Sequence, residues 1–267
     1  MYTFDAPEKK NSPPPVLRRT VKESPFNRSK GIQATSERAL RSIAREVGKL
    51  IKGYSPDDPV SEQSLNQALK SYSEIIGPWA LHVVNNVIQA VDSQDKFAWR
   101  QHSKNMSLAL RNELQNAPVG DTVKDLFQQN VTLIKSIPLQ AAERVHKLIQ
   151  ENMMQSKRAS DVAKKIMETE YVTKNRATLI ARTEIAKASL ALTQARALYV
   201  GSDGYIWHTS GDLIVRKSHR AMNGKFCRWD SPPLINEGTD EKPNMIAHGP
   251  GEIWNCRCFP EPILPDI

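Results

Sequence analysis

The sequence has few cysteines and few aromatic side chains, and it has no long apolar run. Three cysteines among 267 residues cannot form a disulfide framework, so we expect a reducing compartment. The mean hydropathy is −0.51, and no apolar stretch approaches the roughly 20 residues that span a bilayer, which predicts no transmembrane segment. Residues 1–15 contain no apolar run, so we expect no secretory signal there.

Positive charge is in excess. The chain has 37 Lys and Arg residues against 29 Asp and Glu residues, a net charge of +8. This balance favours an acidic partner, either a nucleic acid or a negatively charged protein surface. Charge alone does not choose between the two.

The first segment, residues 1–35, is polar, basic and rich in proline. Such a segment buries too little apolar surface to offset the entropy lost on ordering, so we expect a disordered arm. Its basic residues are not interleaved with aromatic ones, which argues against base stacking. A solvated tail and a tether that orders on a protein or nucleic acid both fit this composition.

Residues 36–172 carry apolar residues at helical spacing, separated by Gly and Pro. The stripes are mostly single-faced, so the helices should pack against one another as a helical body. We expect its helices to begin near Ser36, Ser61, Pro78, Asp121, Pro138 and Ser160.

Residues 173–267 have a different pattern. A long helix is expected from about Lys174 to Val200, followed by a strand at Tyr205–Thr209 that pairs with Leu213–Arg216 in a short hairpin. The fold class is therefore mainly α, with a helical body followed by a small α+β module of irregular loops. The core of this module is expected to contain Trp207, Trp229 and Trp254.

An ordered set of short motifs lies between Arg176 and Phe259, about a third of the chain. It consists of Arg182-Thr183-Glu184, Trp207, Asp212, Arg216, His219, Asn223-Gly224, Trp229, Pro232-Pro233, Pro250-Gly251-Glu252 and Cys256-Arg257-Cys258. This order resembles the phage head-morphogenesis family typified by the F protein of phage Mu.

The resemblance implies a minor capsid protein of a tailed bacteriophage or prophage, acting in prohead assembly at or near the portal. A role in DNA packaging or ejection is a further option. The implied partners are the portal protein, the major capsid or scaffold protein and packaged DNA, with no membrane. The implied location is the phage head, and the host cytoplasm during assembly.

Two other functions stay open. Beside the structural assembly protein that the resemblance implies, the first is a DNA-binding internal head protein that uses its basic residues. The two roles are compatible, because a protein inside the head lies beside DNA. The second is an enzyme or toxin-associated module centred on His219. The resemblance favours a protein without enzymatic activity.

The cysteines offer soft metal ligands. Cys227, Cys256 and Cys258, with His219 or His248, make a set that tetrahedral zinc commonly uses. The Cys-x-Cys spacing is tighter than the usual Cys-x-x-Cys, and three free buried cysteines explain the pattern as well. We therefore expect no cofactor, with zinc as the alternative.

His219 also suggests catalysis. With Asp212 and a cysteine, His219 has the residue types of a Cys-His-Asp catalytic triad. With Arg216 and Asn223 it has those of a histidine-based nuclease site. We favour a buried polar network of Asp212, Arg216 and His219 that fixes the surrounding loops. Arg257 is expected to complete the network by bonding loop carbonyls or Glu184.

Overall fold

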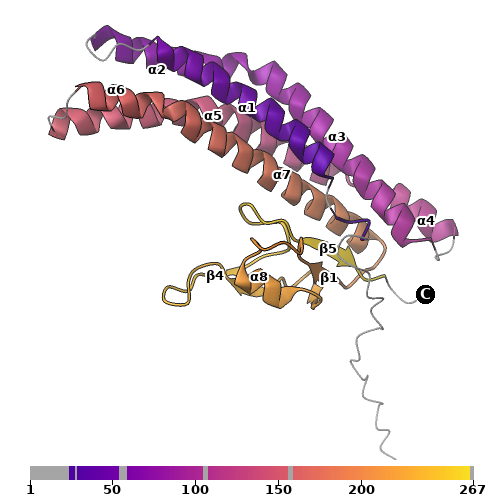
Figure 1. The fold of residues 1–267 in the computed structure, drawn as a ribbon. Helices are drawn as coiled ribbons and strands as arrows, with labels where there is room; N and C mark the ends of the chain where they lie inside the picture. The colour runs from indigo at the N-terminus through magenta and orange to yellow at the C-terminus, as the bar shows by residue number, and fades with distance from the viewer. Residues whose placement is uncertain (1–23, 28, 54–58, 105–107, 156–158, 265–267) are drawn as a thin grey trace, which may run out of the picture.

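The computed structural model describes residues 24–27, 29–53, 59–104, 108–155 and 159–264. The expected disorder of residues 1–23 falls outside these ranges. The mainly α fold class is confirmed, because a long bundle of helices is followed by a small module of short strands beneath one end of α7 (Figure 1).

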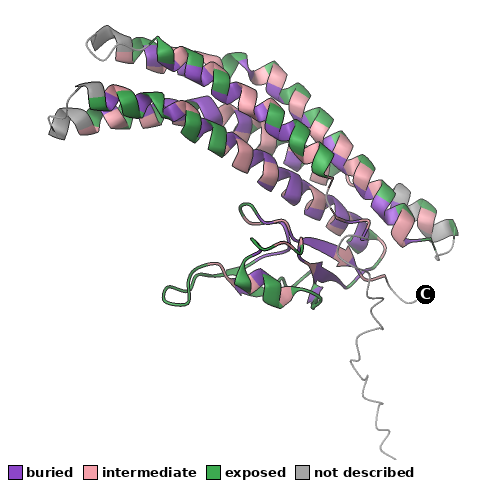
Figure 2. Cartoon of the chain, in the orientation of Figure 1, coloured by how far each residue is buried: buried purple, intermediate pink, exposed green. Residues whose placement is uncertain are grey.

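The bundle consists of long helices whose buried faces point toward each other and whose outer faces are exposed (Figure 2). None of the helices in the described ranges combines the length and apolarity needed to cross a bilayer. The helices are α1 (Lys30–Lys52), α2 (Pro59–Ile75), α3 (Gly77–His102), α4 (Leu108–Gln115), α5 (Gly120–Gln155), α6 (Ala159–Met167) and α7 (Thr169–Tyr199).

The first helix begins earlier than the expected Ser36. Ser29 caps α1 by accepting a hydrogen bond from the backbone N–H of Ile32, and Lys30–Thr35 is helical rather than part of an arm. Phe26, just before it, is buried and packs edge-on against Trp99 with ring centroids 5.3 Å apart. A cap and one aromatic anchor therefore order a segment whose average composition predicts disorder.

The sequence predicts that a helix begins at Pro138. In the structure Pro138 instead lies inside α5. Proline removes one backbone donor and crowds the carbonyls of the preceding turn. The hydroxyl of Ser73, a buried residue of α2, donates to the Lys135 carbonyl at 2.8 Å. α5 continues through the proline, and α2 donates to the carbonyl next to that of Ile134, the one that an N–H at position 138 would bond.

The module contains two antiparallel sheets. One has the order β2-β1-β5, and the other pairs β3 with β4. The elements are β1 (Gly204–His208), α8 (Lys217–Met222), β2 (Phe226–Arg228), β3 (Leu234–Asn236), β4 (Met245–Ala247) and β5 (Phe259–Pro262).

The strand at β1 was predicted, but its expected partner was wrong. Leu213–Arg216 forms a turn, and β1 pairs instead with Phe226–Arg228. The connection to β2 ends at Gly224, whose φ of +80° is one that glycine tolerates and whose N–H donates to the Trp207 carbonyl at 2.8 Å. The Asn-Gly turn therefore belongs to the β1–β2 pair.

A second hydrophobic core joins the module to the bundle. It contains Trp99 of α3, Leu190 and Ala197 of α7, and Trp207 and Trp229 of the module. The expected core residue Trp254 is instead 48% exposed, with the Lys187 ammonium 5.3 Å above its ring centroid. Both α3 and α7 also contribute to the bundle core, so these two helices lie in both cores.

A buried ion-pair network fixes α7 to α3 between the two cores. The Arg196 side chain has no solvent exposure and pairs with Asp95 and, at 2.5 Å, with Asp92. Thr193 also donates to Asp95, at 2.5 Å. Burial raises the pKa of Asp95 to about 6, although Arg196 opposes the shift.

We expect Arg196→Met to lower the free energy of unfolding by about 3–5 kcal/mol, because it removes the cation that pairs with the buried Asp95 carboxylate and leaves Asp92 only its ion pair with Lys96. Urea denaturation at pH 8, where Asp95 is ionised, measures this loss. The control is Lys49→Met, which removes an exposed ion pair with Glu46 and should cost less than about 1 kcal/mol. Equal losses for the two variants would show that the network does not stabilise the fold.

Candidate functional site

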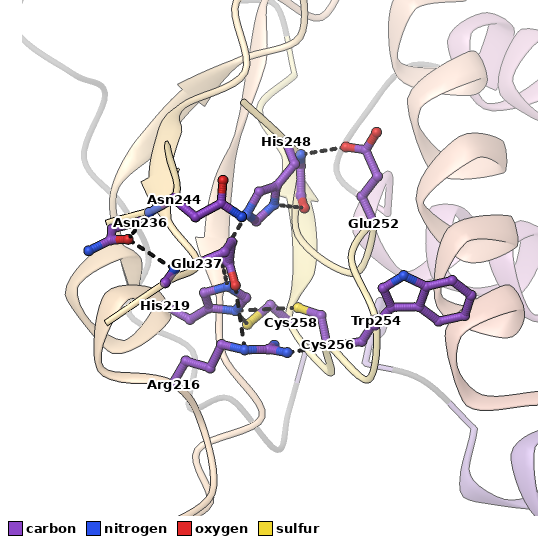
Figure 3. Close-up of polar contacts among 12 residues, drawn as sticks. Arg216, His219, Asn236, Glu237, Asn244, His248, Glu252, Trp254, Cys256 and Cys258 are labelled. Carbon is purple, nitrogen blue, oxygen red and sulfur yellow. Dashed lines mark hydrogen bonds and ion pairs between the residues drawn. The ribbon is translucent and has the colours of Figure 1, made fainter. Parts of the chain in front are cut away.

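Four polar side chains from three segments of the module meet around His219 (Figure 3). His219 lies on α8, Glu237 directly follows β3, and His248 directly follows β4. Cys256 and Cys258 lie in the loop before β5. Within this group, both histidines and both cysteines are at most 2% exposed.

Glu237 is the acceptor that organises the group. Its Oε1 lies 2.7 Å from His219 Nε2 and 2.9 Å from His248 Nε2, and its Oε2 lies 3.4 Å from Arg216 Nε. A carboxylate can only accept, so both imidazoles direct an N–H at it. The other nitrogen of His248, Nδ1, faces the Gly249 carbonyl at 2.9 Å, so each ring nitrogen of His248 has an oxygen acceptor beside it.

The second nitrogen of His219 faces two sulfur atoms. Its Nδ1 lies 3.4 Å from Cys256 Sγ and 3.5 Å from Cys258 Sγ. A hydrogen bond from Cys258 lowers the pKa of Cys256 to about 3, burial opposes the shift, and His219 adds to it. Burial lowers the pKa of His219, but Cys256 and Glu237 outweigh this and leave it raised. The two shifts favour the same charge separation, a thiolate at Cys256 beside a protonated ring at His219.

Cys227, also predicted as a metal ligand, is not brought to this group. It lies on β2, where its Sγ is 3.9 Å from the Lys225 carbonyl, and burial raises the pKa of its thiol. The structure therefore assembles His219, Cys256 and Cys258, and it adds His248 on the far side of Glu237.

The Cys-His-Asp set is wrong, because Asp212 pairs with Arg257 at 2.7 Å and not with His219. The predicted network of Asp212, Arg216 and His219 does not form as one group. Arg216 and His219 both contact Glu237, whereas Asp212 pairs with Arg257, and Arg216 is exposed rather than buried. Arg257 was expected to bond loop carbonyls or Glu184, and its partner is instead the Asp212 carboxylate. Glu237 is the acid beside His219, and no motif or periodicity in the sequence marks it.

The other motif residues hold the backbone of the module in place. The Thr183 hydroxyl accepts from the Asn255 N–H at 3.1 Å, and the Asn223 side-chain carbonyl accepts from the Thr209 N–H at 2.9 Å. Arg182 donates to Glu37 of α1 at 2.7 Å, which ties the motif region to the bundle. These contacts stabilise the fold rather than present groups to a substrate.

The cavity beside the His219 group is small. Its volume is about 20 Å³, which is room for about one water molecule, and its lining includes Ser210, Arg216, His219, Cys256 and Cys258. A larger cavity of about 370 Å³ lies between α5 and the start of α7, lined by Arg144, Lys147, Glu151 and Arg176 among others. It contains none of the predicted site residues.

Comparison with known proteins gives one family. Residues 143–260 match the model of the family described as Phage Mu protein F like protein, which confirms the resemblance for the C-terminal region. The match begins inside α5 and ends inside β5, so it includes α6, α7 and most of the module. No solved structure matches the chain.

One relative is a protein of Haemophilus influenzae strain Rd that is described as uncharacterized. It is 30% identical over 238 residues, which cover 88% of this chain and 45% of the relative. The chain thus spans less than half the length of that protein.

We expect Glu237→Gln to lower the free energy of unfolding of the module by about 1.5–3 kcal/mol. The reason is that a neutral amide replaces the carboxylate to which two imidazoles donate hydrogen bonds. Near-ultraviolet circular dichroism during urea unfolding measures this, since Trp207 packs edge-on against His219. Glu241→Gln, an exposed change in the loop between β3 and β4, is the matched control and should be neutral. The role given to Glu237 is contradicted if both variants unfold like the wild type.

Proposed function

We propose that this chain, whose residues 143–260 match the Phage Mu protein F-like family, is a head-morphogenesis protein of a tailed bacteriophage or prophage. The observation that carries the proposal is this match, since it covers the whole set of motifs from Arg182 to Cys258. The finer assignment is a minor capsid protein that acts in prohead assembly at or near the portal.

The use made of the motif residues supports an assembly role over catalysis. Thr183, Asn223 and Gly224 fix backbone segments, and Trp207 and Trp229 fill the core. In the described part of the chain, the cavity beside His219 has room for about one water molecule, which is too small for an organic substrate. We therefore propose that the protein acts by binding other head proteins.

Exposed apolar side chains offer surfaces for such binding. Leu213 and Ile214 are adjacent in the turn after β1 and are 93% and 78% exposed. On the bundle, Ile75 and Phe97 are 74% and 55% exposed. Exposed apolar groups that lie together are typical of protein interaction sites. We propose that the turn at Leu213–Ile214 contacts the portal protein.

The test is to purify proheads from cells that express the chain with the portal, scaffold and major capsid proteins of the same genome. Mass spectrometry should detect the chain in the particles, in fewer copies than the major capsid protein. The double variant Leu213→Ser/Ile214→Ser should reduce its incorporation at least about tenfold, since each lost apolar contact weakens binding.

Ile75→Ser is the control, because it removes an equally exposed apolar side chain from the bundle and should leave incorporation unchanged. Absence of the wild-type chain from proheads, with normal particle assembly in a deletion strain, would contradict the assembly role. Normal incorporation of the double variant would contradict only the proposed portal contact.

A further inference from the structure

We propose that His219 Nδ1, Cys256 Sγ and Cys258 Sγ bind one zinc ion, with a water molecule from the adjoining cavity as fourth ligand. The two cysteines lie 37 and 39 residues after His219, and folding brings the three ligand atoms within 4.8 Å of one another. The inference is independent of the proposed role in head assembly.

The spacing of the ligand atoms fits tetrahedral zinc. Zn–S bonds of about 2.3 Å and Zn–N bonds of about 2.0–2.1 Å place N and S about 3.6 Å apart at the tetrahedral angle. The two N–S distances here are 3.4 and 3.5 Å. A metal ion placed between the three atoms therefore requires only small movements of the side chains.

A second group, His219, Glu237 and His248, does not fit a metal as well. Nitrogen and oxygen ligands of one tetrahedral zinc lie about 3.3 Å apart. The distances from Glu237 Oε1 to the two Nε2 atoms are 2.7 and 2.9 Å, which are hydrogen-bond lengths. We therefore assign Glu237 as the acceptor that orients His219, and not as a ligand.

The surroundings of the three ligands are those of a zinc site. A histidine ligand usually donates its other ring N–H to a carboxylate, and Glu237 accepts that bond from His219. The backbone N–H of Gly251 points at Cys256 Sγ at 3.3 Å, as expected beside a thiolate.

Charge and burial also favour a divalent ion. All three ligand residues are at most 2% exposed, and two thiolates neutralise the charge of Zn²⁺. The small polar cavity lined by His219, Cys256 and Cys258 has room for the water molecule that completes four-coordination. The ion would link α8 to the loop before β5, so its binding should stabilise the module.

The first experiment measures metal in the full-length chain, purified under reducing conditions from zinc-supplemented cells without chelator. Elemental analysis should find about one zinc per chain. Replacement by Co²⁺ should give the visible bands of a tetrahedral site and near-ultraviolet sulfur-to-cobalt charge transfer. A chain that binds neither metal, or a Co²⁺ spectrum without sulfur bands, overturns the proposal.

The second experiment compares variants. Cys256→Ser and Cys258→Ser should lose zinc, whereas the matched control Cys227→Ser removes a buried cysteine of the same module and should keep it. Glu237→Gln should weaken zinc binding about 10- to 100-fold without changing the stoichiometry. Equal zinc loss in the Cys227 variant would overturn the assignment. A Cys256–Cys258 disulfide in wild-type protein that was purified under reducing conditions and treated with zinc would also overturn it. If a cysteine variant does not fold, the wild-type Co²⁺ spectrum decides.

Discussion

The fold depends on the way the Arg196 guanidinium holds α7 against α3. Its partners Asp92 and Asp95 both lie on α3, and none of the Arg196 side chain reaches solvent. Because α3 and α7 contribute to both hydrophobic cores, this network sets the position of the module relative to the bundle. β1 follows directly from α7, and its neighbour Ser202 accepts a hydrogen bond from the Trp229 indole at 3.2 Å.

Local apolar spacing predicts most of the helices, and the errors occur where tertiary contacts decide. The sequence predicts a helix start at Pro138, but Pro138 lies inside α5. Nearby, α5 contacts α2, where Ser73 donates to the Lys135 carbonyl. The partner of β1 is missed because Phe226–Arg228 is only three residues long and has no periodic signal of its own. The turn at Leu213–Arg216 has the apolar character of a strand, but Leu213 is exposed.

The sequence predicts which residue types form the site, but it does not predict how they are arranged in space. His219, Cys256 and Cys258 stand out in the sequence as soft ligands, and the structure brings them together. Cys227 has the same soft ligand type, but β2 carries it to another part of the module. Glu237 is an ordinary acidic residue in a polar loop until β3 places it between two histidines.

If α7 joins the bundle and the module into one cooperative unit, native-state hydrogen exchange should show it. The amides of α7 from Leu190 to Tyr199 and those of β1 should open with the same free energy. They should also respond together to added urea. Full protection of this part of α7 while β1 exchanges freely would show that the bundle and the module open as separate units.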